Sequence, residues 1–327
     1  MEQIFIYLTQ YALACWETLV EMAPYICLGF LVAGILHIFV HSQTIAKYLG
    51  QGRIRSVIYA ALLGIPLPLC SCGVLPTTAG LKKQGANNGA AMSFLIATPE
   101  TGVDSIAVTY ALLDPIMTIF RPIAAFLTAI TAGISENFLG KSYQEQTIHP
   151  AVDQGCKVDG CCSGEDCPPE EHRRHHSFSE KLRAAVRYGF GEILNDIAKW
   201  LLFGIAIAGA IMIAIPDDVL QTYLHGGIHS MLLMLLVGIP FYICATASTP
   251  IAAALILKGV SPGAALVFLL AGPATNAATI SVVYGMFRTR ATAIYLGSIT
   301  VCSVVLGLLL DEIYNSLQIS AAAIAGN

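Results

Sequence analysis

The sequence predicts an all-α polytopic membrane protein with about eight transmembrane segments, arranged in two repeated halves whose helices are broken by Pro and Gly. Three observations predict this fold class: the composition, the spacing of long apolar segments, and an internal repeat. Of the 327 residues 56% are hydrophobic and only 12% are charged, with a mean hydropathy of +0.69. Soluble domains carry roughly 25% charged residues. This composition argues against a soluble enzyme and against a nucleic-acid partner, and it predicts that lipid surrounds most of the chain.

The apolar segments have the length that a bilayer requires. A hydrocarbon core roughly 30 Å thick needs about 20 apolar helical residues. By that measure the segments are 19–40, 57–79, 89–111, 115–134, 192–215, 229–256, 263–287 and 291–310. One long polar stretch interrupts them, which divides the chain into a first membrane repeat (1–135), a polar Cys/His-rich loop (136–187) and a second membrane repeat (188–327).

The two halves repeat. Over the first segment the shift is 175 positions, which brings Glu17 and Gly34 onto Glu192 and Gly209, and over the segments that follow it is 174 positions without a gap. Under this shift Gly64, Pro66, Cys70 and Pro76 coincide with Gly238, Pro240, Cys244 and Pro250. Paired segments interrupted by Gly and Pro are typical of secondary transporters, in which they line the substrate site near the midplane. The alternative is that these prolines are ordinary kinks in packed helices. The halves could be parallel or inverted, because hydropathy does not settle the number of crossings.

A pair of cysteines follows the prolines of the second apolar segment. Cys70 and Cys72 could hold a soft metal or metalloid, since thiolates select Cu(I), Zn and similar ions. Cys244 is the repeat counterpart of Cys70, so three thiols could meet in one cavity. The alternative is that the two cysteines are small apolar residues packed between helices.

Two acids lie in the third apolar segment, in the run from Thr98 and Pro99 to Asp104. Glu100 and Asp104 are four residues apart, which would place them on one face of a helix. Acids within the membrane typically mark ion pathways or proton relays. We therefore expect a transport site at these residues and at the corresponding break of the second half, Thr275 and Asn276. The alternative places the acids at the membrane surface, in water.

Arg121, in the fourth segment, needs a partner if it is buried, and Asp114 and Asp104 are the candidates.

The polar loop is rich in metal-binding side chains, namely Cys156, Cys161, Cys162, Cys167, His172, His175 and His176. These could form a tetrahedral Zn site or a thiolate site for Cu(I). Structural disulfides and an unordered linker are the alternatives. Lys181, Arg183 and Arg187 favour a cytoplasmic loop. If each half has four spans, however, basic residues in some of the other connections would lie outside the cell, which conflicts with a cytoplasmic loop. A re-entrant segment in each half would remove the conflict.

No nucleotide-binding module or metalloprotease motif occurs in the chain, so we expect no enzyme and no required cofactor. Transport would depend on an ion gradient or on a partner protein.

The motif Pro-Leu-Cys-Ser-Cys-Gly at 68–73, the run GAAMSFLIATPETGVDSIAVTYALL at 89–113 and its echo in the second half resemble the bacterial predicted-permease family that includes organoarsenical efflux permeases. The Cys-rich loop is similar to that of the branch described as copper/zinc efflux transporters. The resemblance implies an inner-membrane, multi-pass exporter with Cys70, Cys72 and Glu100 in motif positions. We expect Cu or Zn as the substrate, and a second copy of the chain is a possible protein partner in a homo-oligomer. An organoarsenical or other metalloid permease is the first alternative, and a metal-sensing or anchoring protein without flux is the second.

Overall fold

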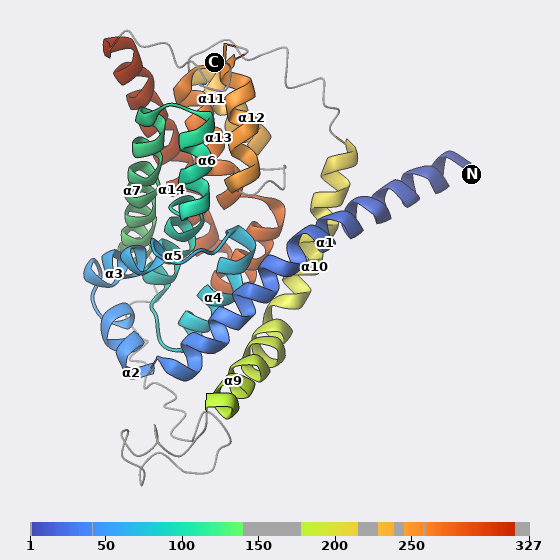
Figure 1. The fold of residues 1–327 in the computed structure, drawn as a ribbon, viewed down its shortest axis with the longest axis vertical. Helices are drawn as coiled ribbons and strands as arrows, with labels where there is room; N and C mark the ends of the chain where they lie inside the picture. Colours follow the sequence, from blue (N-terminus) through green and yellow to red (C-terminus); the bar gives the residue numbers. More distant parts are fainter. Residues whose placement is uncertain are drawn as a thin grey trace.

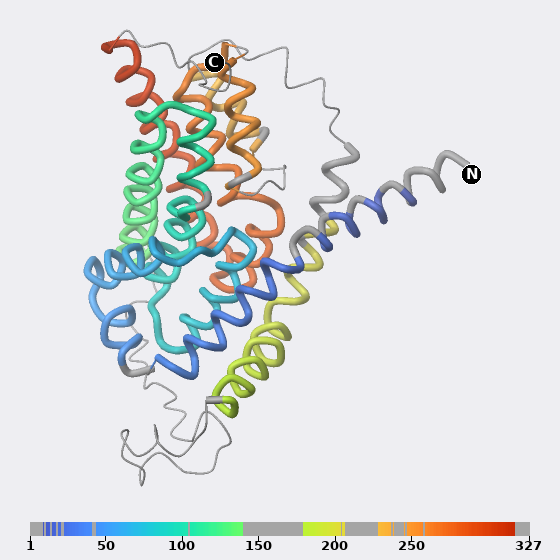
Figure 2. Tube along the Cα trace, in the orientation of Figure 1, coloured from blue at the N-terminus to red at the C-terminus, as the bar shows by residue number. Residues whose placement is uncertain are grey.

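The computed structural model describes residues 2–40, 42–139, 178–214, 228–238, 245–257 and 259–317, which are the coloured parts of Figure 1, and Figure 2 traces the same backbone as a tube. Within these residues every regular element is helical, as predicted. The helices are α1 (Glu2–Phe39), α2 (Ser42–Ile45), α3 (Arg55–Gly64), α4 (Ser71–Lys83), α5 (Asn88–Glu100), α6 (Val103–Leu112), α7 (Pro115–Leu139), α9 (Phe178–Arg187), α10 (Leu194–Ala214), α11 (Ile228–Gly238), α12 (Ala245–Leu257), α13 (Pro262–Ala274) and α14 (Ala277–Leu317). Two π-helical turns, Ala46–Gly50 and Tyr188–Ile193, continue α2 and α9.

Two helices, α7 and α14, are long and apolar enough to cross a membrane unaided. Several other apolar helices are shorter than a bilayer is thick, because the apolar segments contain breaks. The predicted segment 57–79 is two helices, α3 and α4, and the predicted segment 89–111 is α5 and α6. Pro66 and Pro68 lie in the first break and lack the N–H that a continuous helix would use. The expectation that the helices in these two ranges are broken is therefore confirmed.

Helices of the second half begin and end at the positions that the shift of 174 gives. This holds for α4 and α12, for α5 and α13, and to within one residue for α3 and α11. Helix α14 corresponds to α6 and α7 together, and its one residue with non-helical backbone, Arg288 with φ 65°, corresponds to Asp114 between α6 and α7. The backbone turns before α5 and α13 also match, since Gly85 and Gly259 have φ of 102° and 92°.

Side-chain contacts recur with the same shift. Asn137 Oδ1 accepts a hydrogen bond from the N–H of Gly89 at 3.1 Å, and Asp311 Oδ1 accepts one from the N–H of Gly263 at 2.6 Å. Both bonds fasten the start of one helix to the end of another, α5 to α7 and α13 to α14. The corresponding helices of the two halves are thus held by corresponding contacts.

Each long helix pairs with its own counterpart in antiparallel orientation. Tyr11 near the start of α1 donates to the carbonyl of Ala206 near the end of α10, at 2.9 Å, whereas Gly34 near the end of α1 lies against Ala185 of α9, which leads into α10. Figure 1 shows α1 descending and α9 with α10 rising beside it. Helices α7 and α14 also run antiparallel, because Asp114 contacts Tyr314 and the carbonyl of Leu139 contacts Arg290.

Candidate functional site

A buried carboxylate lies at the end of α5, in the middle of the molecule. Helix α5 starts with an Asn87 cap, whose side chain accepts a hydrogen bond from the N–H of Ala90 at 2.8 Å, and it stops at Glu100. The Glu100 residue is 1% exposed. The alternative that this acid is solvated at the membrane surface is wrong.

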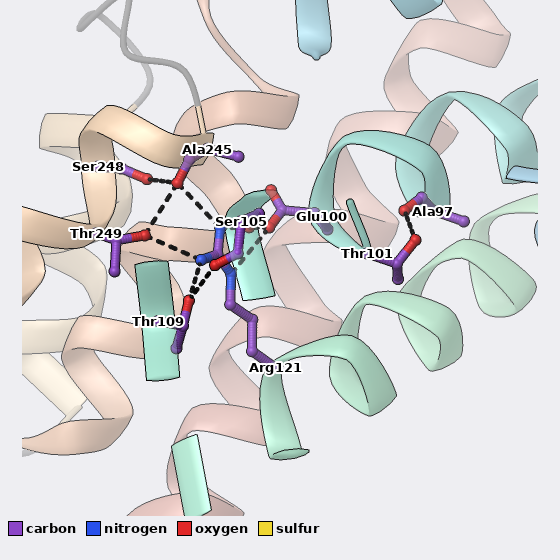
Figure 3. A network of polar contacts seen from close by, with 9 residues as sticks. All are labelled: Ala97, Glu100, Thr101, Ser105, Thr109, Arg121, Ala245, Ser248 and Thr249. Atoms are coloured by element: carbon purple, nitrogen blue, oxygen red, sulfur yellow. Dashed lines mark hydrogen bonds and ion pairs between the residues drawn. The ribbon is translucent and has the colours of Figure 1, made fainter. Parts of the chain in front are cut away.

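The partner of Glu100 is Arg121 of α7, which is completely buried (Figure 3). Glu100 Oε2 accepts hydrogen bonds from Arg121 Nε at 3.3 Å and from Nη2 at 3.1 Å. Two charges that leave water at such a depth are tolerated only when they are paired and hydrogen-bonded. The predicted partners of Arg121, Asp114 and Asp104, are therefore replaced by Glu100. Asp114 instead accepts hydrogen bonds from the Tyr314 hydroxyl and from the N–H of Met117.

The remaining donors of Arg121 connect the first half to the second. Its Nη1 donates to the hydroxyl of Thr109 on α6 at 2.8 Å and to that of Thr249 on α12 at 3.0 Å, and its Nη2 donates to the carbonyl of Ala245 at 3.3 Å. Ala245 is the first residue of α12. Arg121 therefore links α5, α6 and α7 of the first half to the start of a broken helix in the second half, as Figure 3 shows.

Two polar atoms in this network are buried and have no hydrogen-bond partner among the described residues. They are Oε1 of Glu100 and the hydroxyl of Ser105, which lies beside the network in Figure 3. An unpaired buried oxygen costs roughly 1–3 kcal/mol. Such an oxygen can be retained as the place where a proton or a hydrogen-bond donor of a ligand binds.

The second half has a neutral version of the same pair. Shifted by 174 positions, Glu100 and Arg121 become Ala274 and Tyr295, and the Tyr295 hydroxyl donates to the carbonyl of Ala274 at 2.7 Å. Asn276, also buried, caps the start of α14 by accepting from the N–H of Thr279 at 2.8 Å. The charge is thus confined to one half, while the contact between the two positions exists in both.

The other predicted residues of this site are distributed as follows. Thr98 and Thr275 are buried, and their hydroxyls donate to the carbonyls of Phe94 and Ala271, one turn earlier in α5 and α13. Glu100 and Asp104 do not share a helix face, because α5 ends at Glu100 and α6 begins at Val103. The reason is the break at Thr101 and Gly102, which follows Pro99. The side chain of Asp104 lies outside what the structure describes.

The thiol of Cys72 is buried in the first turn of α4, and Cys70, directly before α4, is half-buried. Cys72 belongs to the same apolar cluster as Ala97, Ala274 and Tyr295, which flank the charged network. Cys244 and the predicted metal-binding residues of the loop, Cys156, Cys161, Cys162, Cys167, His172, His175 and His176, lie outside the described residues. Within the described part, no three His, Cys, Asp or Glu side chains are close enough to share a metal ion.

Sequence reasoning identified Glu100 but omitted Arg121, Thr109 and Thr249 from the candidate site. An arginine inside an apolar segment was a signal that could have added Arg121. The two threonines carried no such signal, because hydroxyls are common in membrane helices and only the folded chain brings them to one guanidinium.

A helical protein with broken apolar helices and a charged network buried between its two halves has the features of a membrane permease. The comparison with known families agrees: residues 9–312 match the predicted-permease family ArsP_1, and the chain belongs to that family. The protein is therefore a multi-pass membrane permease.

Curated relatives match across most of their own length. A UPF0718 protein of Methanocaldococcus jannaschii is 25% identical, with 86% of this chain and 91% of the relative covered. A UPF0718 protein of Bacillus subtilis is 24% identical, with 83% and 87% covered. A Streptococcus mutans protein that is provisionally named as a subunit of a two-component membrane permease complex is 23% identical, with 86% and 88% covered. No solved structure matches the chain.

Proposed function

We propose that this permease is a secondary-active efflux transporter that exports soft metal ions such as Cu or Zn, and that it is not an enzyme and requires no cofactor. The observation that carries the proposal is the buried network of Glu100 and Arg121, which joins the ends of broken helices from both halves. Broken helices that meet around buried polar groups line the substrate and ion sites of secondary transporters. The unpaired Oε1 of Glu100 supports a role for this carboxylate in binding the coupling proton.

Thiols supply the preference for soft metals in this proposal. Cys72 is buried in the cluster that flanks the network, and Cys70 precedes the start of α4. Thiolates bind Cu(I) and Zn more strongly than hard cations. The Cys- and His-rich stretch from Cys156 to His176 would capture the metal before it reaches the membrane site.

We also propose that the chain crosses the membrane six times and that each half contains one re-entrant hairpin. The hairpin helices α3, α4, α11 and α12 have 10 to 13 residues. At 1.5 Å per residue they are roughly 15–20 Å long, shorter than a hydrocarbon core of about 30 Å. The complete crossings are then α1, α5 with α6, α7, α10, α13 with the first part of α14, and the rest of α14. Three crossings per half, an odd number, make the two halves inverted.

The distribution of basic residues supports a cytoplasmic loop in the inner membrane. We call the end of the molecule at which α1 finishes the basic end. It carries ten of the 17 lysines and arginines, namely Lys47, Arg53, Arg55, Lys82, Lys83, Lys181, Arg183, Arg187, Arg288 and Arg290. Contacts hold these segments together: the Arg53 carbonyl accepts from Asn137, Lys82 donates to the Met286 carbonyl, and Lys83 pairs with Asp196 at 2.6 Å. Basic residues favour the cytoplasmic side. Re-entrant hairpins thus remove the conflict that four spans per half would create.

The partners that we propose are the metal ion and the lipid bilayer, with a second copy of the chain or a separate subunit as a protein partner. The name of the Streptococcus mutans relative suggests the latter. Purification from mild detergent, followed by a mass measurement of the complex, distinguishes the two.

Cellular metal content tests the proposed function. Cells with and without the protein are challenged separately with zinc, copper and methylarsenite, and each element is measured by mass spectrometry. We expect lower zinc or copper with the intact protein and no reduction with Cys70→Ser. Cys27→Ser is the matched control, because Cys27 is an exposed cysteine on α1, and it should export normally.

The other outcomes of this experiment contradict specific parts of the proposal. Lower arsenic alone would support the organoarsenical or other metalloid permease. Equal export by Cys70→Ser would remove that thiol from the mechanism. Absence of flux for every element, repeated with purified protein in liposomes under an imposed proton gradient, would favour the metal-sensing or anchoring protein.

A further inference from the structure

The pairing of the long helices defines how the two halves are related. Helix α1 lies antiparallel to its repeat counterpart α10. Helix α7 likewise lies antiparallel to its counterpart, the part of α14 that follows Arg288. When a helix crosses its own counterpart in this way, a two-fold axis passes between them, perpendicular to the helices. In a membrane that axis lies parallel to the bilayer plane, which is the arrangement of an inverted repeat.

The α1–α10 pair departs from this symmetry. Helix α1 packs tightly on α4: a Cβ at Gly29 would lie 2.3 Å from the Gly73 carbonyl oxygen, and Thr77 donates to the Gly29 carbonyl at 3.2 Å. The symmetric contact would be α10 on α12, and among the described residues these two helices do not pack together. Helix α10 instead packs on the first part of α14.

The contact of α10 with α14 is made by an aromatic pair. The rings of Trp200 and Tyr284 have centroids 5.5 Å apart in an edge-on arrangement, and the Trp200 ring would lie 2.4 Å from a Cβ at Gly285. Since α4 and the first part of α14 both reach the basic end, where Lys82 binds the Met286 carbonyl, the α1–α10 pair is packed against that end of the molecule.

The counterparts of this aromatic pair are Tyr25 on α1 and Tyr110 on α6. Tyr25 corresponds to Trp200 with a shift of 175, and Tyr110 to Tyr284 with a shift of 174. Both are exposed, at 51% and 65%, and in the described part of the chain α1 does not pack on α6. Ala111 corresponds to Gly285, so if the two helices met in the same way, the smaller Tyr25 ring would meet a residue with a Cβ where the larger Trp200 ring meets a glycine. This pairing conserves the volume that close packing requires.

We propose that Tyr25 and Tyr110 form an interaction surface between α1 and α6, used in a second conformation in which the α1–α10 pair swings toward the opposite end. In that conformation α10 packs on α12, Tyr25 packs on Tyr110 as Trp200 packs on Tyr284, and the basic end opens. Two states that exchange the packing of inverted halves are the basis of alternating access. The proposal rests on the proposed transport function but not on the identity of the substrate.

Photocrosslinking tests the second conformation without knowledge of the substrate. Benzoylphenylalanine replaces Tyr25 in the full-length protein in native membranes, and adducts are mapped by mass spectrometry. We expect adducts with α6 around Tyr110 in addition to adducts with α4. The control probe at Trp200 should form adducts with α14 around Gly285. Adducts of the Tyr25 probe with α4 and lipid alone, while the Trp200 probe reaches α14, would overturn the proposal.

A cysteine pair provides the second measurement. Tyr25→Cys with Tyr110→Cys is treated with a short bifunctional thiol reagent, and the linked peptides are identified by mass. We expect the linkage to form and to arrest export. If the cysteine pair exports none of the tested elements before the reagent is added, but the linkage still forms, the proposed substrate is contradicted and the second conformation stands. If metal is exported but neither photocrosslinking nor the cysteine pair links α1 to α6, the proposed substrate stands and the second conformation is contradicted.

Discussion

Arg121 shows how one side chain can join two halves of a membrane protein. A guanidinium has five N–H donors in a planar fork, and here donors from all three nitrogens are used on Glu100, Thr109, Thr249 and the Ala245 carbonyl. The two charges compensate each other, and the neutral acceptors satisfy the rest of the fork. Removing only one partner leaves a buried charge without compensation, which typically costs about 3–5 kcal/mol.

We predict that Glu100→Gln and Arg121→Gln each lower the stability of the purified protein by about that amount, and that the double variant recovers most of the loss. Thermal unfolding in detergent, followed by fluorescence-detected size exclusion, measures it. The recovered double variant should still fail to export metal, because it lacks the carboxylate that we propose as the acceptor of the coupling proton. Normal export by the double variant would reduce the pair to a structural role.

Close helix crossings explain why particular glycines occur in the broken helices. A Cβ at Gly89 of α5 would lie 2.2 Å from the Gly133 carbonyl oxygen of α7, and a Cβ at Gly263 of α13 would lie 2.1 Å from that of Gly307. Small residues let membrane helices approach this closely, and van der Waals packing then stabilises them. The same crossing occurs once in each half, where it positions the starts of α5 and α13.

We expect Gly89→Ala to destabilise the protein by roughly 1–3 kcal/mol, because the added methyl group meets backbone that cannot move independently. Gly297→Ala is the matched control, since no atom lies within 4 Å of its Cβ position, and alanine there should gain up to about 1 kcal/mol of helix propensity. Unfolding temperatures of the two variants in one detergent provide the comparison. Equal shifts would show that the α5–α7 crossing is looser than the structure has it.

The whole molecule is polarised, with basic residues gathered at one end and the connection between the halves leaving and returning there. Helix α7 ends at Leu139, whose carbonyl binds Arg290, and α9 begins at Phe178 of the same end. An inverted arrangement explains this, because corresponding loops of the two halves then lie on opposite sides of the membrane. Parallel halves would place basic residues on both sides.

A protease site inserted after residue 150 should be cleaved in inside-out vesicles and resist cleavage in right-side-out vesicles, because basic residues favour the cytoplasmic side. Cleavage is read as the appearance of two fragments on an immunoblot. A site inserted after residue 220, between α10 and α11, should show the opposite pattern. Cleavage of both sites from the same side would refute the inverted arrangement.

The sequence by itself determined the membrane class, the shift of 174, the breaks at Pro66 and Pro99, and Glu100 as a candidate site residue. Each of these depends on composition or on residues near one another in the chain, where hydropathy and proline chemistry act directly.

The tertiary structure decided the partner of Glu100 and the antiparallel packing of α1 with α10 and of α7 with α14. Glu100 and Arg121 are separated by 21 positions and a helix break, and Thr249 by 128 positions more. Sequence spacing predicts a shared face only while one helix continues. Beyond the break, the packing of α5, α7 and α12 determines which side chains meet, and the number of complete crossings determines whether the halves are inverted.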